Sequence, residues 1–141
     1  MKTRIVLLED HVVVRRALAE LLRRDKELEI VGEASSAREL SLLEDPFDLL
    51  ISDLCLPGPD GLSAIAEMRR RWPERRILVL TMYDDAFRAA AAFAAGADGF
   101  AVKLDDDATL LQAVHAVVEG RRWLSPLVAG AAVDRLLLRT R

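Results

Sequence analysis

Three carboxylates stand where short apolar runs of the sequence end. Glu9 and Asp10 follow the run 4–8, and Asp53 follows the run 48–52. If these runs are neighbouring parallel strands, the three carboxylates meet at one edge of a sheet. Like charges that close cannot all stay ionised without a cation. Oxygen ligands favour Mg²⁺, which also accepts phosphate oxygens, so the spacing predicts a metal-assisted phosphoryl site.

The elements that must position these carboxylates alternate regularly along the chain. Short apolar runs predict strands at 4–8, 29–34, 49–52, 77–81 and 99–103, and amphipathic segments between and after them predict five helices. Such an alternation predicts an α/β fold with a doubly wound, five-stranded parallel sheet in the order 2-1-3-4-5, of the flavodoxin-like kind. Strand 29–34 is less apolar than the others and is expected at an edge.

Two further polar residues close predicted strands. Thr81 ends the fourth strand and Lys103 ends the fifth. In doubly wound sheets chemistry collects at the carboxyl ends of strands, where the strand order reverses. The fold would therefore bring both residues close to the three carboxylates.

Composition narrows the class of protein. The chain has 141 residues, 52% of them hydrophobic, which predicts a folded domain with a real core. A formal net charge of −3 argues against a general nucleic-acid surface. The sequence has one cysteine, and no apolar run approaches the ~20 residues that a membrane span needs. The first predicted strand begins almost at the amino terminus. These features predict a cytoplasmic protein without a membrane span.

The chain resembles the receiver domain of two-component response regulators over nearly its whole length. The motifs that carry the resemblance are LLEDH at 7–11, LISDLCLP at 50–57, DG at 60–61, VLTMYDD at 79–85 and GADGFAVK at 96–103. Each motif is weak alone, whereas the ordered set at the strand ends is specific. The residues around Thr81 and Gly96, together with LSP at 124–126, are similar to those of the NarL/FixJ (LuxR-type) class.

The resemblance implies a role for each strand-end residue. Asp53 would accept a phosphoryl group from a phosphohistidine on a sensor histidine kinase, and Lys103 and Thr81 would contact its oxygens. Phe100 stands at the aromatic switch position of the family and would rotate inward after phosphorylation. The implied Mg²⁺ ligands are the carboxylates of Glu9, Asp10 and Asp53 and the backbone carbonyl of Cys55.

Some residues depart from the family pattern. Leu104 follows Lys103 where many receivers have proline, and Phe100 lacks the hydroxyl of the commoner tyrosine. Met82 is bulkier than the small residue usual after the threonine and is expected to hinder access to Asp53. Tyr83 and Cys55 are expected to flank the route of the hydrolytic water, so dephosphorylation would be either slow or fast, and the sequence leaves the direction open.

The end of the sequence is predicted to form a separate segment. Residues 1–122 would be the receiver, and 123–141 a turn at 123–126 followed by a tail helix over 127–139. In the family class this tail leads to a helix-turn-helix DNA-binding domain, for which too few residues remain, so DNA would be bound only through that missing domain. A receiver excised from a longer transcription regulator is the favoured interpretation, and a stand-alone receiver or pseudo-receiver acting through protein–protein contacts is the alternative. The wide apolar surface of the fifth helix predicts either a homodimer, phosphorylation-dependent in the family, or packing against the tail.

Two other functions share features with this sequence. A phosphohydrolase with an aspartyl nucleophile needs a second acid two residues later, and here that residue is Cys55. A flavin-binding module needs a Ser-, Thr- and Gly-rich phosphate loop after the first strand, where Glu9 and Asp10 would repel phosphate. The expectation is therefore a signalling phosphoacceptor and not an enzyme with a separate substrate.

Overall fold

A parallel sheet forms the centre of the molecule in the computed structural model, which describes residues 2–54, 61–83 and 85–130. The strand order is β2-β1-β3-β4-β5-β6, and every neighbouring pair is parallel. The strands are β1 (Thr3–Leu8), β2 (Leu28–Ala34), β3 (Leu49–Ser52), β4 (Arg76–Thr81), β5 (Gly99–Val102) and β6 (Trp123–Leu124). The predicted order 2-1-3-4-5 is confirmed, and β2 lies at an edge as expected.

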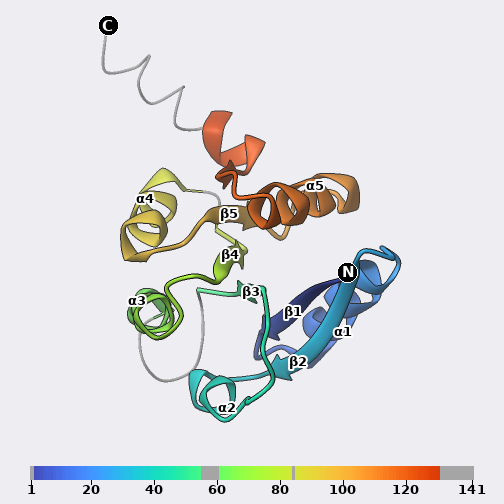
Figure 1. Ribbon diagram of the computed structural model, residues 1–141. Coiled ribbons are helices and arrows are strands. Elements are labelled where there is room, and N and C mark those ends of the chain that lie inside the picture. The colour runs from blue at the N-terminus through green and yellow to red at the C-terminus, as the bar shows by residue number, and fades with distance from the viewer. Residues whose placement is uncertain (1, 55–60, 84, 131–141) are drawn as a thin grey trace, which may run out of the picture.

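Helices cover both faces of the sheet (Figure 1). They are α1 (Val12–Arg23), α2 (Ala37–Ser41), α3 (Gly61–Arg71), α4 (Ala86–Ala95) and α5 (Asp107–Val118). In Figure 1, α1 and α5 lie on one side of the strands and α2, α3 and α4 on the other. Two buried apolar clusters fill the two interfaces, because the central strands are apolar on both faces.

Short polar side chains fix where several helices begin. The side chains of Ser36, Asp85 and Asp106 each accept a hydrogen bond from the backbone N–H three residues on, at the starts of α2, α4 and α5. Such caps satisfy backbone donors that have no partner within the helix. Gly96 ends α4 with φ of 119°, a left-handed conformation that favours glycine.

The segment after α5 differs from its prediction. Instead of a turn over 123–126, Trp123–Leu124 form β6 at the edge of β5. The N–H of Ser125 donates to the carbonyl of Phe100 at 2.9 Å, so the segment uses hydrogen-bonding groups that β5 would otherwise leave open. The predicted boundary after residue 122 thus falls directly before a sixth strand of the sheet.

The tail helix begins where it was expected, with residues 126–130 helical. Val128 is buried in the same apolar cluster as Phe100 and the α4 residues Ala89 and Ala92, whereas the core residues of α5 belong to the other cluster. The described start of the tail therefore packs into the α4 side of the sheet. The predicted role of Cys55, the motif residues 55–60 and the predicted helix beyond residue 130 lie outside the described residues.

Candidate functional site

The carboxyl ends of β1 and β3 place Glu9 and Asp53 side by side. The two strands are in register up to Leu8 and Ser52, and the N–H of Asp53 donates to the carbonyl of Leu8 at 3.1 Å. The next residue of each strand is therefore an acid at the same edge. Both are buried, with 3% of Glu9 and 5% of Asp53 exposed, so their charges are poorly solvated.

Lys103 reaches the two carboxylates from the end of β5. Its Nζ lies 2.9 Å from Oδ2 of Asp53 and also donates to Oε1 of Glu9. The N–H of Lys103 donates to the carbonyl of Thr81 at 2.8 Å, which ties the ends of β4 and β5 together. Residues 94 and 50 positions apart in the sequence thus form one ion-paired group.

Asp10 and His11 extend the acidic cluster. Side-chain ligand atoms of Glu9, Asp10, His11 and Asp53 lie within 4.8 Å of one another. The Nδ1 of His11 lies 3.3 Å from Oδ1 of Asp10 and 3.6 Å from Oε2 of Glu9. His11 is not among the site residues predicted from the sequence, although its position directly after two acidic strand-end residues was an available signal.

Arg15 is a second residue of the site that the sequence reading missed. Its Nη1 donates to the backbone carbonyl of Glu9 at 2.7 Å, and its Nε lies 3.3 Å from Oε1 of Glu33 at the end of β2. It thus holds the loop that carries the acidic pair. No pattern around Arg15 marks it, because both partners are reached only after α1 packs beside β1 and β2.

The charges of the cluster do not balance. Three carboxylates, of Glu9, Asp10 and Asp53, face one ammonium, that of Lys103, so the sum is −3 + 1 = −2. Burial and the charge of Asp53 raise the pKa of Glu9, and the hydrogen bond from Lys103 offsets only part of this effect. Burial alone would lower the pKa of Lys103, but its hydrogen bonds to Glu9 and Asp53 prevail and raise it.

Three buried oxygens of this region have no hydrogen-bond partner among the described residues. They are Oε2 of Glu9, Oδ1 of Asp10 and Oγ1 of Thr81. Buried polar atoms are normally paired, since an unpaired one costs free energy. Two carboxylate oxygens with a surplus charge of −2 fit one divalent cation, and the Thr81 hydroxyl is a donor still available to an acceptor oxygen.

The remaining predicted residues lie around this centre. Phe100 is fully buried on β5, so its ring already occupies the interior that was expected only after phosphorylation. Met82 and Tyr83 follow Thr81 and are 58% and 42% exposed, and the guanidinium of Arg88 lies 3.9 Å from the Tyr83 ring centroid. No cis peptide bond occurs among the described residues, which makes the bond between Lys103 and Leu104 trans.

Comparison with known proteins identifies the family to which this chain belongs. The family model described as response regulator receiver domain matches residues 5–115. The oxygen regulatory protein NreC of Staphylococcus haemolyticus is 33% identical over 137 residues, and the DNA-binding transcriptional activator DevR/DosR of Mycobacterium tuberculosis is 36% identical over 136. A crystal structure of a LuxR-family two-component response regulator from Aurantimonas sp. SI85-9A1 superposes with a TM-score of 0.90 at 38% identity, covering 96% of this chain and 99% of that one.

Each of these two matches covers most of this chain but a smaller share of the relative. The matches span 95% and 94% of this chain but only 63% of NreC and 62% of DevR/DosR. The chain thus spans less than two thirds of the length of these relatives. It corresponds in extent to the LuxR-family structure, which it matches almost from end to end.

Proposed function

The chain belongs to the response regulator receiver domain family, and from this premise we propose that it is a phosphorylation switch in which Asp53 is the phosphoacceptor. The observation that carries the proposal is the convergence of Asp53, Glu9 and Lys103 at the carboxyl edge of the sheet. A buried carboxylate held by an ammonium at 2.9 Å is a positioned nucleophile.

In the proposed reaction, a carboxylate oxygen of Asp53 forms a bond to phosphorus. The bond between phosphorus and the imidazole nitrogen of a phosphohistidine on the kinase breaks, and the imidazole leaves with that electron pair. Lys103 then transfers its hydrogen bond to a phosphoryl oxygen, and the hydroxyl of Thr81 donates to another. These two hydrogen-bond donors, which already lie at the site, would thereby stabilise the negative charge of the phosphoryl group.

The acidic side chains would hold Mg²⁺. Glu9, Asp10 and Asp53 are the proposed carboxylate ligands, and the backbone carbonyl of Cys55, outside the described residues, is a further one. When bound, the ion would supply positive charge that balances the cluster and the incoming phosphoryl oxygens. The surplus charge of −2 and the oxygens of Glu9 and Asp10 that have no hydrogen-bond partner among the described residues support this assignment.

The phosphorylated form would differ in the loops after β4 and β5. Movement of Thr81 and Lys103 toward phosphoryl oxygens would shift the adjoining strand ends, and Phe100 lies on β5 in the same buried cluster as Val128 of the tail. A free-energy difference of about 1–3 kcal/mol between two forms is sufficient for a useful switch. We therefore place the output surface on α4, β5 and α5, close to the tail.

The partners follow from the family. A sensor histidine kinase would supply the phosphoryl group, and a homodimer is the proposed signalling form. DevR/DosR is named a DNA-binding transcriptional activator, and because this chain spans only part of such relatives, transcriptional output is proposed to act through a further domain. No described helix is long and apolar enough to cross a membrane. We propose action in the cytoplasm, without turnover of a separate substrate.

The decisive experiment is phosphorylation of the purified chain with acetyl phosphate and Mg²⁺, followed by intact-mass spectrometry. We expect the mass of one phosphoryl group on the unaltered protein and none on Asp53→Asn. Asp45→Asn makes the same chemical change at an exposed aspartate and should leave the uptake intact. A folded protein that gains no phosphoryl group would favour a pseudo-receiver that works through protein–protein contacts.

A further inference from the structure

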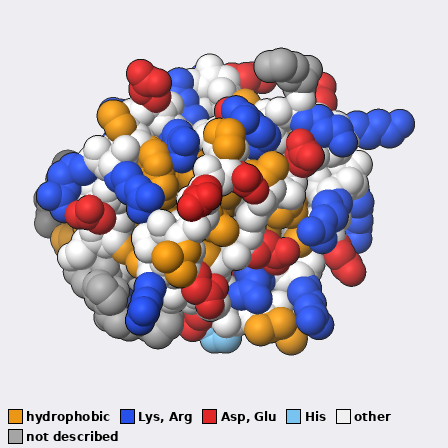
Figure 2. Space-filling view, turned by 60° about the horizontal axis from the view of Figure 1, so that its bottom comes forward, with side chains coloured by type: hydrophobic (Ala, Val, Ile, Leu, Met, Phe, Trp, Pro, Cys, Tyr) orange, Lys and Arg blue, Asp and Glu red, His pale blue; other side chains and the backbone are white. Residues whose placement is uncertain are grey.

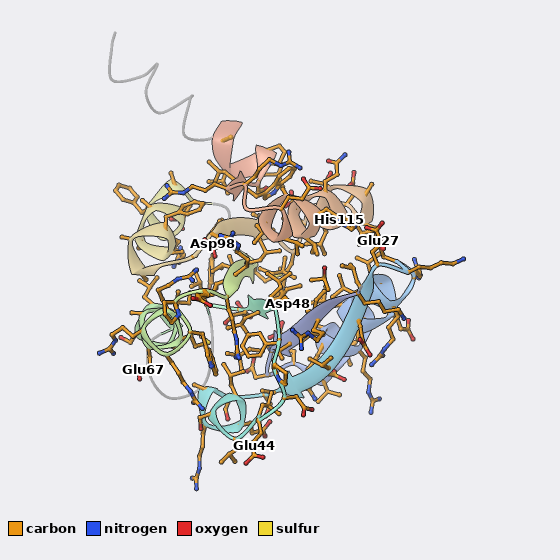
Figure 3. All side chains as sticks on the ribbon, viewed as in Figure 1. Glu27, Glu44, Asp48, Glu67, Asp98 and His115 are labelled. Carbon is orange, nitrogen blue, oxygen red and sulfur yellow. The ribbon has the colours of Figure 1, made fainter. Side chains whose placement is uncertain are left out.

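A polar hollow lies at the edge of the sheet opposite to Asp53. It has a volume of about 540 Å³ and gathers at the amino ends of the strands, where Arg4 belongs to β1, Asp48 precedes β3 and Arg76 begins β4. Figure 3 labels Asp48 beside β3. The other lining residues come from the segment before β3, from the end of α3 and the segment that links it to β4, and from α5: Pro46, Phe47, Arg71, Trp72, Pro73, Glu74, Arg75 and Val118. We refer to it as the arginine pocket.

Aromatic rings support two guanidinium groups of the arginine pocket. The Arg75 guanidinium lies 4.2 Å from the ring centroid of Phe47 and 5.1 Å from that of Trp72, and the Arg71 guanidinium lies 4.7 Å from Trp72. The two rings themselves pack edge to face at 5.0 Å. A guanidinium stacked on a ring keeps its in-plane N–H groups for other partners, and its position is fixed in advance.

The positive charge of the pocket is only partly compensated. Arg4 is paired with Asp48, at 3.2 Å between Nη2 and Oδ1. Among the described residues, Arg71, Arg75 and Arg76 have no carboxylate within ion-pair distance. Four arginines and two acids, Asp48 and Glu74, line the pocket, so the sum is +4 − 2 = +2. Burial and the charges of Arg4 and Arg71 lower the pKa of Arg75, as expected of a guanidinium crowded by like charge.

This arrangement differs from an ordinary basic surface. On the face shown in Figure 2, Lys and Arg side chains are interspersed with Asp and Glu and do not merge into one basic patch. In the arginine pocket, by contrast, four arginines surround one concave space, and within the described part of the chain only Arg4 of these four has a carboxylate at ion-pair distance. A surplus of two charges facing one space is the condition for binding a multivalent anion.

We propose that the arginine pocket binds a phosphate-bearing anion with at least two negative charges, of the polyphosphate or nucleoside diphosphate class. Planar guanidinium groups match pairs of phosphate oxygens, and the aromatic rings hold Arg71 and Arg75 in place from the ring faces. One N–H of Arg71 already donates to the carbonyl of Ser41 at 3.4 Å, so its other N–H groups are the ones proposed for the anion. The volume exceeds that of a single water or monovalent ion, which leaves room for more than one phosphate. This site is independent of phosphorylation at Asp53.

Calorimetric titration with inorganic pyrophosphate, and separately with a nucleoside diphosphate, tests the proposal. Both titrations are done without Mg²⁺, so that the acidic cluster offers the anion no cation. We expect binding that weakens with ionic strength, and a loss of about tenfold or more in affinity for Arg75→Ala and for Arg71→Ala. Binding of the nucleotide alone would assign the ligand to that source, and binding of pyrophosphate alone to free polyphosphate.

Three controls separate the pocket from net charge, from misfolding and from the phosphoacceptor. Arg16→Ala removes the same charge from an exposed position on α1 and should leave the affinity unchanged. Arg75→Lys keeps the charge without the planar fork and should bind more weakly than the unaltered protein, with an unchanged circular dichroism spectrum. Asp53→Asn should bind normally. Absence of binding to both anions at millimolar concentration, or equal losses for Arg16→Ala and Arg75→Ala, would overturn the proposal.

Discussion

Ser125 donates its hydroxyl to Oδ1 of Asp105 at 2.9 Å, and this contact joins the loop after β5 to the start of the tail. The other carboxylate oxygen of Asp105 accepts the N–H of Val102 at 3.0 Å. Ser125 is fully buried, and Asp105 lies two residues after Lys103. The loop that carries the Lys103 ammonium is therefore bonded directly to the segment that leaves the sheet.

Removal of that hydroxyl should weaken this attachment. Ser125→Ala leaves one oxygen of Asp105 without its partner, and we expect the free energy of unfolding to fall by about 1–2 kcal/mol. Urea denaturation followed by circular dichroism measures the change. Ser63→Ala, at an exposed position of α3, should stay within about 0.5 kcal/mol of the unaltered protein. Equal stabilities for the two variants would show that the Ser125 contact contributes nothing.

Much of the candidate site could be predicted from strand ends. Parallel strands end at one edge of a sheet, so an acid after β1, an acid after β3 and a lysine after β5 had to meet once the strand order was inferred. That reasoning needs only hydrophobic runs and the residue that follows each run. The roles in phosphoryl transfer remain predictions.

Features that depend on tertiary packing gave no such signal. A turn was predicted over residues 123–126, because a run of two residues is too short to show strand periodicity. The strand at Trp123–Leu124 depends on its pairing with the open edge of β5. The contacts of Arg15 and the arginine pocket could not be predicted from the sequence either, because the residues that form them come from separate elements. Charged residues there look like ordinary solvated positions until the fold gathers them.

Magnesium should stabilise the folded protein through the acidic cluster. A ligand at a concentration 100 times its dissociation constant raises the free energy of unfolding by about 2.7 kcal/mol. We expect thermal unfolding to shift upward with Mg²⁺ and to return when a chelator removes the ion. Asp10→Asn should abolish most of the shift, whereas Asp107→Asn, exposed on α5, should retain it. A shift preserved in Asp10→Asn would remove Asp10 from the ligands.

Acid should weaken the contact between α5 and the loop after α1. His115 Nε2 lies 2.6 Å from Oδ2 of Asp25, and Figure 3 shows His115 beside Glu27 of the same loop. The hydrogen bond from His115, followed by the bond from the N–H of Glu27, lowers the pKa of Asp25. A carboxyl whose folded-state pKa is depressed stabilises the fold above its unfolded pKa and loses that contribution as pH falls through the folded value.

The size of this acid effect is limited by solvent, since both side chains are partly exposed. We expect Asp25 to contribute up to about 1 kcal/mol at neutral pH. Urea midpoints measured from about pH 6 down to about pH 3 should therefore fall less steeply for Asp25→Asn than for the unaltered protein. Asp45→Asn is the matched control. Parallel pH profiles for all three proteins would contradict the assignment.

Gly61 is required by the close approach of the backbone of Leu54, the residue after Asp53. A Cβ atom at residue 61 would lie 1.9 Å from the backbone oxygen of Leu54, so the backbone would have to move. Gly61→Ala should lower the free energy of unfolding by about 2–3 kcal/mol and reduce phosphoryl uptake, because Leu54 directly follows the phosphoacceptor. Gly130 lies in a helical segment, and an added Cβ there would meet no described atom within 4 Å outside its own helix backbone, so Gly130→Ala should be neutral or stabilise by up to about 1 kcal/mol. Equal thermal midpoints would refute the steric argument.

The Thr81 hydroxyl should destabilise the unphosphorylated protein and stabilise the phosphorylated form. Its Oγ1 is buried and has no hydrogen-bond partner among the described residues. Thr81→Val removes this group, and we expect the unphosphorylated protein to gain about 1 kcal/mol in the free energy of unfolding. With beryllofluoride and Mg²⁺ as a phosphoryl mimic, the same variant should gain less stability than the unaltered protein, because the acceptor loses its donor. Thr109→Val makes the same change at a residue whose backbone N–H caps α5 by donating to Asp106, away from the acidic cluster, and should show neither effect. A Thr81→Val protein stabilised by the mimic as strongly as the unaltered one would exclude Thr81 from phosphoryl binding.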